Sequence, residues 1–153
     1  MNYYLDTEFN EFGGDLISLA LVREDTGGFL YVATACLEPG AWVEANVLTV
    51  LDVPGADPVM ILPGSFGRFI ADFLDGDDCP NIISDWPDDI RYFCQALITG
   101  PGEMVNIPRL AFEVRRVDAY PTTLEGAVQH NALWDARALR HLLLANTGGT
   151  ENG

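Results

Sequence analysis

The sequence contains no lysine. Its eight basic residues, all arginine, face 23 acids, so the formal net charge is -15 over 153 residues. A surface this acidic repels polyanions at long range, which argues against broad binding to duplex nucleic acid. Arginine suits bidentate contacts to phosphate, but a composition bias of the source genome explains the missing lysine equally well. The arginine usage therefore carries little weight.

Cysteine is scarce, and long apolar runs are missing. Cys36, Cys79 and Cys94 are odd in number and form no CxxC pair, which favours a reducing compartment over a disulfide framework. The N-terminus has no basic segment followed by an apolar stretch, and no run of about eighteen apolar residues occurs. We therefore expect a cytoplasmic protein with neither a signal peptide nor a membrane span.

Hydrophobic residues make up 48% of the chain and aromatic residues 10%, which is the composition of a folded globular protein. A chain of this length supports one domain with a substantial core. We predict a single domain over residues 1–146 and a flexible C-terminal tail over 147–153.

Apolar runs separated by turn residues predict five strands. The first reads as a buried central strand, and the next two should form an antiparallel meander with it. A fourth strand should be parallel. We expect these strands at residues 3–9, 16–22, 29–35, 81–84 and 112–117.

Helical spacing of apolar residues predicts four helices, at 41–51, 66–74, 88–98 and 131–145. Ser65 and Asn131 stand where N-cap residues are expected, and Pro87 precedes the third helix. Three prolines in the segment 53–64 predict a loop. A meander followed by strand and helix units indicates an α/β fold with a mixed sheet flanked by helices.

Two acids follow closely in the first predicted strand. Side chains alternate along a strand, so Asp6 and Glu8 project to the same side and could hold one cation together. Chance alone produces acids two residues apart roughly three times in a chain this acidic. The apolar surroundings strengthen the pair, because two buried carboxylates repel each other unless a cation or a proton intervenes. A solvated edge position remains the alternative.

A second group of acids, Asp85, Asp88 and Asp89, surrounds the start of the third predicted helix. The helix dipole favours negative charge there, so capping alone could explain one or two of them. His130 and Asp135 form a third group. Five residues apart, they would point away from each other on one helix, and they converge only if Asn131 caps the helix and His130 precedes it.

These motifs resemble those of the DEDDh 3′–5′ exonucleases. The resemblance rests on Asp6-Thr7-Glu8, a middle aspartate, and His130-x-Ala132-x-x-Asp135, and it covers residues 3 to 145. Within that superfamily the chain is more similar to small bacterial exoribonucleases of the RNase AS type than to oligoribonuclease or a proofreading subunit.

The resemblance implies a ribonuclease-H-like fold in which four acids hold two Mg²⁺ ions, with Mn²⁺ as a substitute. The acids are Asp6, Glu8, Asp89 and Asp135, and His130 is the general base. Asp89 is preferred to Asp85 because apolar residues follow it, as they do in the family. The implied reaction removes nucleoside 5′-monophosphates from the 3′ end of single-stranded nucleic acid, RNA rather than DNA. A homodimer is also implied.

Aromatic and basic residues near the motifs are candidate substrate contacts. Phe9 and Trp86, and also Phe12, could stack on bases, although core packing is at least as good an explanation for each. Arg115 is a candidate phosphate contact, as are Arg91, Arg109 and Arg116, against the alternative of simple surface solvation.

Two other functions stay open. A DNA exonuclease of the proofreading type would differ only in substrate. A non-catalytic acidic protein that mimics nucleic acid and binds a basic partner would use the charge of -15 directly. Such a mimic needs charge but not acids at every motif position, which favours the nuclease.

Overall fold

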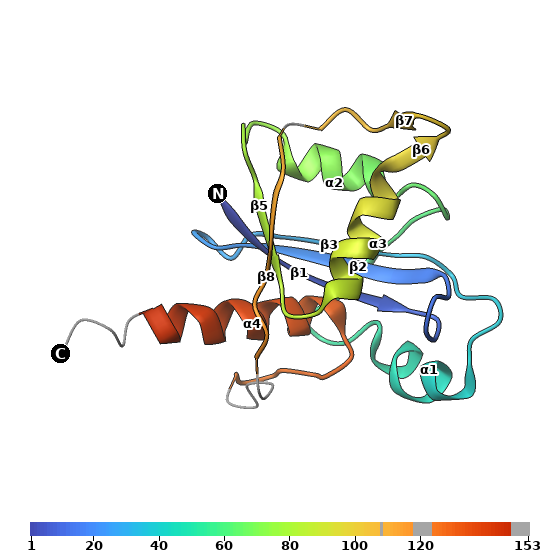
Figure 1. Cartoon of the computed structure of the whole chain (residues 1–153). Helices are drawn as coiled ribbons and strands as arrows, with labels where there is room; N and C mark the ends of the chain where they lie inside the picture. The colour runs from blue at the N-terminus through green and yellow to red at the C-terminus, as the bar shows by residue number, and fades with distance from the viewer. Residues whose placement is uncertain (108, 118–123, 148–153) are drawn as a thin grey trace.

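The computed structural model describes residues 1–107, 109–117 and 124–147. A six-stranded mixed sheet in the order β4-β3-β2-β1-β5-β8 forms its centre (Figure 1). The strands of this sheet are β1 (Asn2–Phe9), β2 (Leu16–Arg23), β3 (Phe29–Ala33), β4 (Val59–Met60), β5 (Asn81–Ser84) and β8 (Ala111–Val114).

The sheet combines the predicted meander with parallel strands. β1 pairs antiparallel with β2, and β2 with β3, whereas β5 lies parallel to β1 on its other side and β8 parallel to β5. The register of β1 and β5 includes Tyr4 opposite Ile83. Because the two strands are parallel, their carboxyl ends meet at one edge of the sheet, and this brings the first two acidic segments together.

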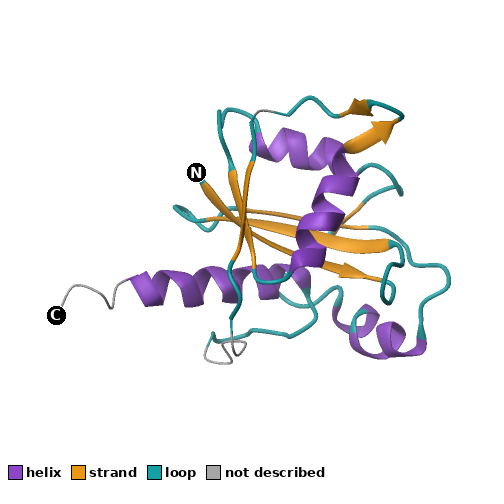
Figure 2. Ribbon diagram, viewed as in Figure 1, coloured by secondary structure: helices purple, strands orange, loops and turns teal. Residues whose placement is uncertain are grey.

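The described residues form four α-helices, of which α2, α3 and α4 cover the faces of the sheet and α1 lies near the strand ends (Figure 2). They are α1 (Ala41–Asn46), α2 (Phe66–Leu74), α3 (Pro87–Leu97) and α4 (Ala132–Thr147). Helices α2 and α3 pack on one face through a core that includes Leu5, Ile70 and Phe93. Helix α4 packs on the other face, against Ala20 through Leu133 and against Tyr4 through Leu139. The α/β fold with a mixed sheet between helices is therefore confirmed, and it matches the ribonuclease-H-like arrangement.

The alternation of side chains along β1 sets the direction of the acids. Tyr3 and Leu5 belong to the core beneath α2 and α3, whereas Tyr4 belongs to the core beneath α4. Asp6 and Glu8 continue the alternation of Tyr4. They therefore project toward the face that α4 covers, and Thr7 between them projects toward α3.

Several predicted boundaries need correction. The helix predicted at 41–51 is the short α1 followed by a 3₁₀ helix, η1 (Leu48–Val50). Ser65 precedes α2, but its side chain makes no capping hydrogen bond, because its own backbone is already helical. The third and last strands of the main sheet end at Ala33 and Val114, earlier than predicted.

The sequence patterns missed three very short strands. Two-residue β4 lies inside the proline-rich segment and pairs with β3. A hairpin of β6 (Ile98–Gly100) and β7 (Glu103–Met104) follows α3. The predicted tail lies mostly outside the described residues, since 148–153 are not among them, and Thr147 still belongs to α4. No helix in the described part of the chain is long and apolar enough to cross a bilayer.

Asn131 fixes the start of α4 through hydrogen bonds in both directions. Its Oδ1 accepts the Trp134 N–H at 3.0 Å, and its amide donates to the Val50 carbonyl at 2.8 Å. The side chain is fully buried. The predicted cap is therefore confirmed, and it also ties α4 to η1.

Replacement of this residue, Asn131→Ala, should lower the free energy of unfolding by about 2–3 kcal/mol, because it removes an N-cap and leaves a partly buried carbonyl without its donor. Urea denaturation monitored by circular dichroism measures the change. Asn46→Ala is a matched control, since that amide bonds an exposed carbonyl. Equal losses for the two variants would contradict the role of Asn131.

Candidate metal centre

A pocket of about 660 Å³ is lined by residues from the end of β1 and from the starts of α3 and α4. All five residues predicted to form the catalytic site contribute to it, although they come from three distant segments of the chain. Its lining consists of Asp6, Thr7, Glu8, Phe9, Glu11, Phe12, Trp42, Val43, Asp85, Trp86, Asp88, Asp89, Gln129, His130 and Asp135.

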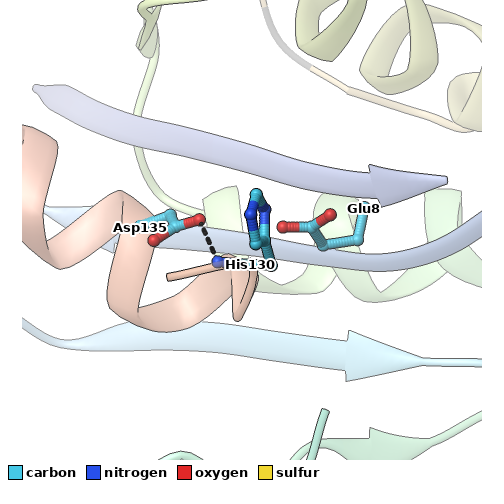
Figure 3. Close-up of side chains that lie close together, drawn as sticks. All are labelled: Glu8, His130 and Asp135. Atoms are coloured by element: carbon cyan, nitrogen blue, oxygen red, sulfur yellow. Dashed lines mark hydrogen bonds between the residues drawn. The ribbon is translucent and has the colours of Figure 1, made fainter. Parts of the chain in front are cut away.

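One group in this pocket consists of Glu8, His130 and Asp135. Each offers a ligand atom, and these atoms lie within 4.8 Å of one another. Figure 3 shows the His130 ring between the two carboxylates, with the His130 backbone N–H donating to Asp135 Oδ2 at 2.9 Å. His130 has a φ of 66°, a left-handed conformation at the residue before the Asn131 cap. Because of this turn His130 lies outside the helix, so its side chain and that of Asp135 can face each other although they are five residues apart.

The second group consists of Asp6, Asp85 and Asp89, whose ligand atoms also lie within 4.8 Å of one another. Hydrogen bonds hold Asp89 firmly. Its Oδ1 accepts the Thr7 N–H at 3.2 Å and the Thr7 hydroxyl at 2.6 Å, and its Oδ2 accepts the Ser84 hydroxyl at 2.6 Å. Asp89 therefore has a fixed orientation at the first turn of α3. The sequence favoured Asp89 over Asp85 as the middle acid, and the structure places both of them in this group.

Asp6, a member of the second group, has an unsatisfied carboxylate oxygen. Its Oδ2 is inaccessible to solvent and has no hydrogen-bond donor among the described residues. An orphaned buried carboxylate oxygen is costly. Such an atom is the position that a bound cation would satisfy.

Burial and mutual repulsion raise the pKa values of these carboxyls. Burial raises the pKa of Glu8 to about 8, that of Asp135 to about 7 and that of Asp89 to about 6. The pKa of Asp6 lies well above its usual range because of burial first and the neighbouring acids second. Burial also lowers the pKa of His130.

The donor set fits hard divalent cations. The two groups offer carboxylate oxygens from five acids and one imidazole nitrogen, and no cysteine lines the pocket among the described residues. Mg²⁺ takes such oxygen ligands and retains some of its water, while Mn²⁺ also accepts imidazole. The pocket could therefore hold two such ions, one at each group.

The predicted substrate contacts have different surroundings. Phe9 stacks on Tyr92 with ring centroids 4.5 Å apart, and it lines the pocket. Trp86 is 48% exposed at the rim, with the Arg116 guanidinium 4.6 Å above its ring. Arg115 is not brought to the pocket, because its guanidinium makes a bidentate pair with Glu113 on β8.

The other candidate substrate contacts also differ in whether they lie at the pocket. Phe12 projects 89% exposed at the pocket rim. Arg91 pairs with Asp88 at 3.0 Å, and its guanidinium lies 6.0 Å from the Phe12 ring. Arg109 is exposed and does not line the pocket.

Sequence reasoning missed Trp42 as a site residue. It lies within the helix predicted at 41–51, and its side chain is 55% exposed and lines the pocket. Its ring meets the His130 ring edge to face at 5.0 Å. No pattern in the sequence identifies this contact, because it joins α1 to the turn before α4, and these segments are far apart in the chain.

A larger cleft of about 790 Å³ lies beside the turn between β1 and β2. Tyr92 and Thr34 are among its walls, but none of the acids of the two groups is. The potential metal ligands therefore gather in the smaller pocket.

Comparison with models of protein families, with curated proteins and with solved structures gives no match for this chain.

The raised pKa values predict a pH-dependent stability in metal-free buffer. The folded-state values of about 8 for Glu8 and about 7 for Asp135 exceed those of unfolded carboxyls, which lie near 4. The folded protein thus keeps protons that the unfolded chain has released. This stabilisation is complete below about pH 4 and is lost as the pH rises through the folded-state values. Urea denaturation in EDTA should therefore give a falling free energy of unfolding between about pH 4 and 8.

Glu8→Gln should flatten this slope, and Glu44→Gln, on the exposed side of α1, should leave it unchanged.

Saturating Mg²⁺ or Mn²⁺ should oppose the loss of stability at high pH and raise the melting temperature by roughly 5–10 °C, since binding at a hundred times Kd adds about 2.7 kcal/mol. Melting that is indifferent to millimolar metal would count against a metal centre and favour the acidic mimic.

Proposed function

We propose that this protein is a metal-dependent 3′–5′ exonuclease that hydrolyses single-stranded nucleic acid, RNA in preference to DNA. The observation that carries the proposal is the convergence of Asp6, Glu8, Asp89, Asp135 and His130 in one pocket. Their sequence motifs resemble those of DEDDh exonucleases, and the ribonuclease-H-like fold fits that resemblance.

The pocket suits a chain end better than a duplex. Its volume of about 660 Å³ is that of a small-molecule site. Phe12, Trp42 and Trp86 surround it with exposed aromatic surface, and aromatic rings stack on unpaired bases of any sequence. The net charge of -15 repels extended polyanions, so attraction of phosphate would be confined to the place where cations are bound.

In the proposed reaction the acids would bind the cations. Asp6 and Asp89 would hold one cation, and Glu8 and Asp135 the other. Two bound divalent cations supply Lewis acidity toward the scissile phosphate, a lowered pKa for the attacking water, and stabilisation of the leaving 3′ oxygen. Thr7 and Ser84 keep Asp89 oriented through their hydrogen bonds.

His130 is suited to accept the proton of the attacking water. Burial lowers its pKa, which favours the neutral imidazole that can accept a proton. Its ring lies between the carboxylates of Glu8 and Asp135, which would stabilise the imidazolium once it forms (Figure 3). Trp42 supports the ring from the side.

Cleavage between phosphorus and the 3′ oxygen leaves the phosphate on the released residue, so the product is a nucleoside 5′-monophosphate. The 3′ polarity, the preference for RNA and a homodimeric state follow from the resemblance of the motifs.

The proposal is tested with a 5′-labelled single-stranded RNA incubated with Mg²⁺ or Mn²⁺. Shortening from the 3′ end should give a ladder of labelled products, and a DNA strand of the same sequence should be degraded more slowly. Asp135→Asn should abolish the ladder. Intact substrate with both metals, or cuts confined to internal positions, would refute an exonuclease.

His130→Ala should reduce turnover by a factor of about 10²–10⁴, the usual contribution of a general base. The metal-induced rise in melting temperature should persist, because the carboxylates remain. His141→Ala provides the control, as that residue is exposed on α4. Turnover close to that of the unmodified protein would remove His130 from the mechanism.

A further inference from the structure

We propose that Asp85 is a ligand of the cation held by Asp6 and Asp89, so that the two metal positions differ in chemistry. One would be formed by the three carboxylates of Asp6, Asp85 and Asp89, and the other by the two carboxylates of Glu8 and Asp135, which leaves His130 free to accept a proton. This inference rests on the metal-dependent hydrolysis proposed above, but it assigns a residue that the four-acid pattern of the motifs leaves out.

The backbone places Asp85 level with Asp6. β5 ends at Ser84, and its parallel register with β1 sets Tyr4 opposite Ile83. Asp6 stands two residues beyond Tyr4 in β1, and Asp85 stands two residues beyond Ile83, directly after the end of β5. A carboxylate oxygen of Asp85 lies within 4.8 Å of ligand atoms of both Asp6 and Asp89. This spacing allows the three carboxylates to meet around one small ion.

The unsatisfied oxygen of Asp6 independently indicates a ligand at this position. Asp6 Oδ2 is buried and lacks a hydrogen-bond donor among the described residues, although it belongs to the group. Repulsion among three neighbouring carboxylates adds to the cost of leaving it bare. A cation between them satisfies the oxygen and relieves the repulsion at once.

The hydrogen bonds of Asp89 explain why a third carboxylate is needed. An ionised carboxylate has about four lone-pair sites. Three of those on Asp89 accept hydrogen bonds, two from Thr7 and one from Ser84. Asp89 can therefore give about one oxygen contact to a cation. Since Mg²⁺ takes six ligands at near-octahedral positions, Asp85 would replace one of the waters that a two-acid position would need.

The alternative explanation for Asp85 is favourable interaction with the dipole of α3. That explanation applies at least as well to Asp88, which lies within the first turn of the helix. Asp88 differs because its carboxylate pairs with Arg91 and belongs to neither group of potential ligands. The two acids thus form a matched pair for experiment.

The test uses the full chain and Mn²⁺ as the probe. Isothermal titration calorimetry should find two Mn²⁺ ions per unmodified chain. Asp85→Asn should weaken one of them at least tenfold and leave the other unchanged. In EDTA the same variant should melt higher than the unmodified protein, because one repelling charge is gone. Asp88→Asn should show neither effect.

Two ions bound by Asp85→Asn as tightly as by the unmodified protein would overturn the inference and leave the proposed nuclease intact. Equal effects of Asp85→Asn and Asp88→Asn would also overturn it, by showing that only the general charge near the helix matters. A failure of the unmodified chain to bind Mn²⁺ would overturn both the inference and the proposed function.

Discussion

Repulsion among carboxylates crowded at one edge of the sheet is the constraint on which the rest of this structure depends. Asp6, Glu8, Asp85, Asp89 and Asp135 meet there, and burial makes their charges harder to tolerate. The fold withstands this because β1 lies between β2 and β5 and is packed from both faces, with Leu5 completely buried. The apolar core thus supplies the free energy needed to keep like charges together.

Fixed hydrogen bonds then give the crowded edge a defined geometry. Thr7 joins the C-terminal part of β1 to Asp89 on α3, and the His130 backbone joins Asp135 to the residue before the Asn131 cap. Asp89 is thus tied to β1 and β5, and Asp135 to the turn that precedes its own helix. A cation entering such a site meets oxygens that are already oriented, so little conformational entropy remains to be lost on binding.

The sequence allowed most of the central architecture to be predicted, because short apolar segments, helical spacing and the Asn131 cap depend on local chemistry. The convergence of Asp6 with Asp135 could be expected only through the motif resemblance. Short β4 could not be predicted, since two residues among prolines carry no periodic signal. The contact of Trp42 with His130 and the pairing of Arg115 with Glu113 depend on tertiary structure and side-chain direction, which spacing along the chain does not encode.

The sheet stops abruptly on one side. Its outermost strand there has only Val59 and Met60, and Pro58 and Pro63 flank it. Proline has no N–H to donate, and two residues expose few backbone groups, so a strand from another molecule would find little to pair with. The opposite margin, β8, is twice as long. Growth of the sheet into fibrils, or its continuation across two copies, would therefore begin at β8. The prolines around β4 prevent further strands from pairing at that edge.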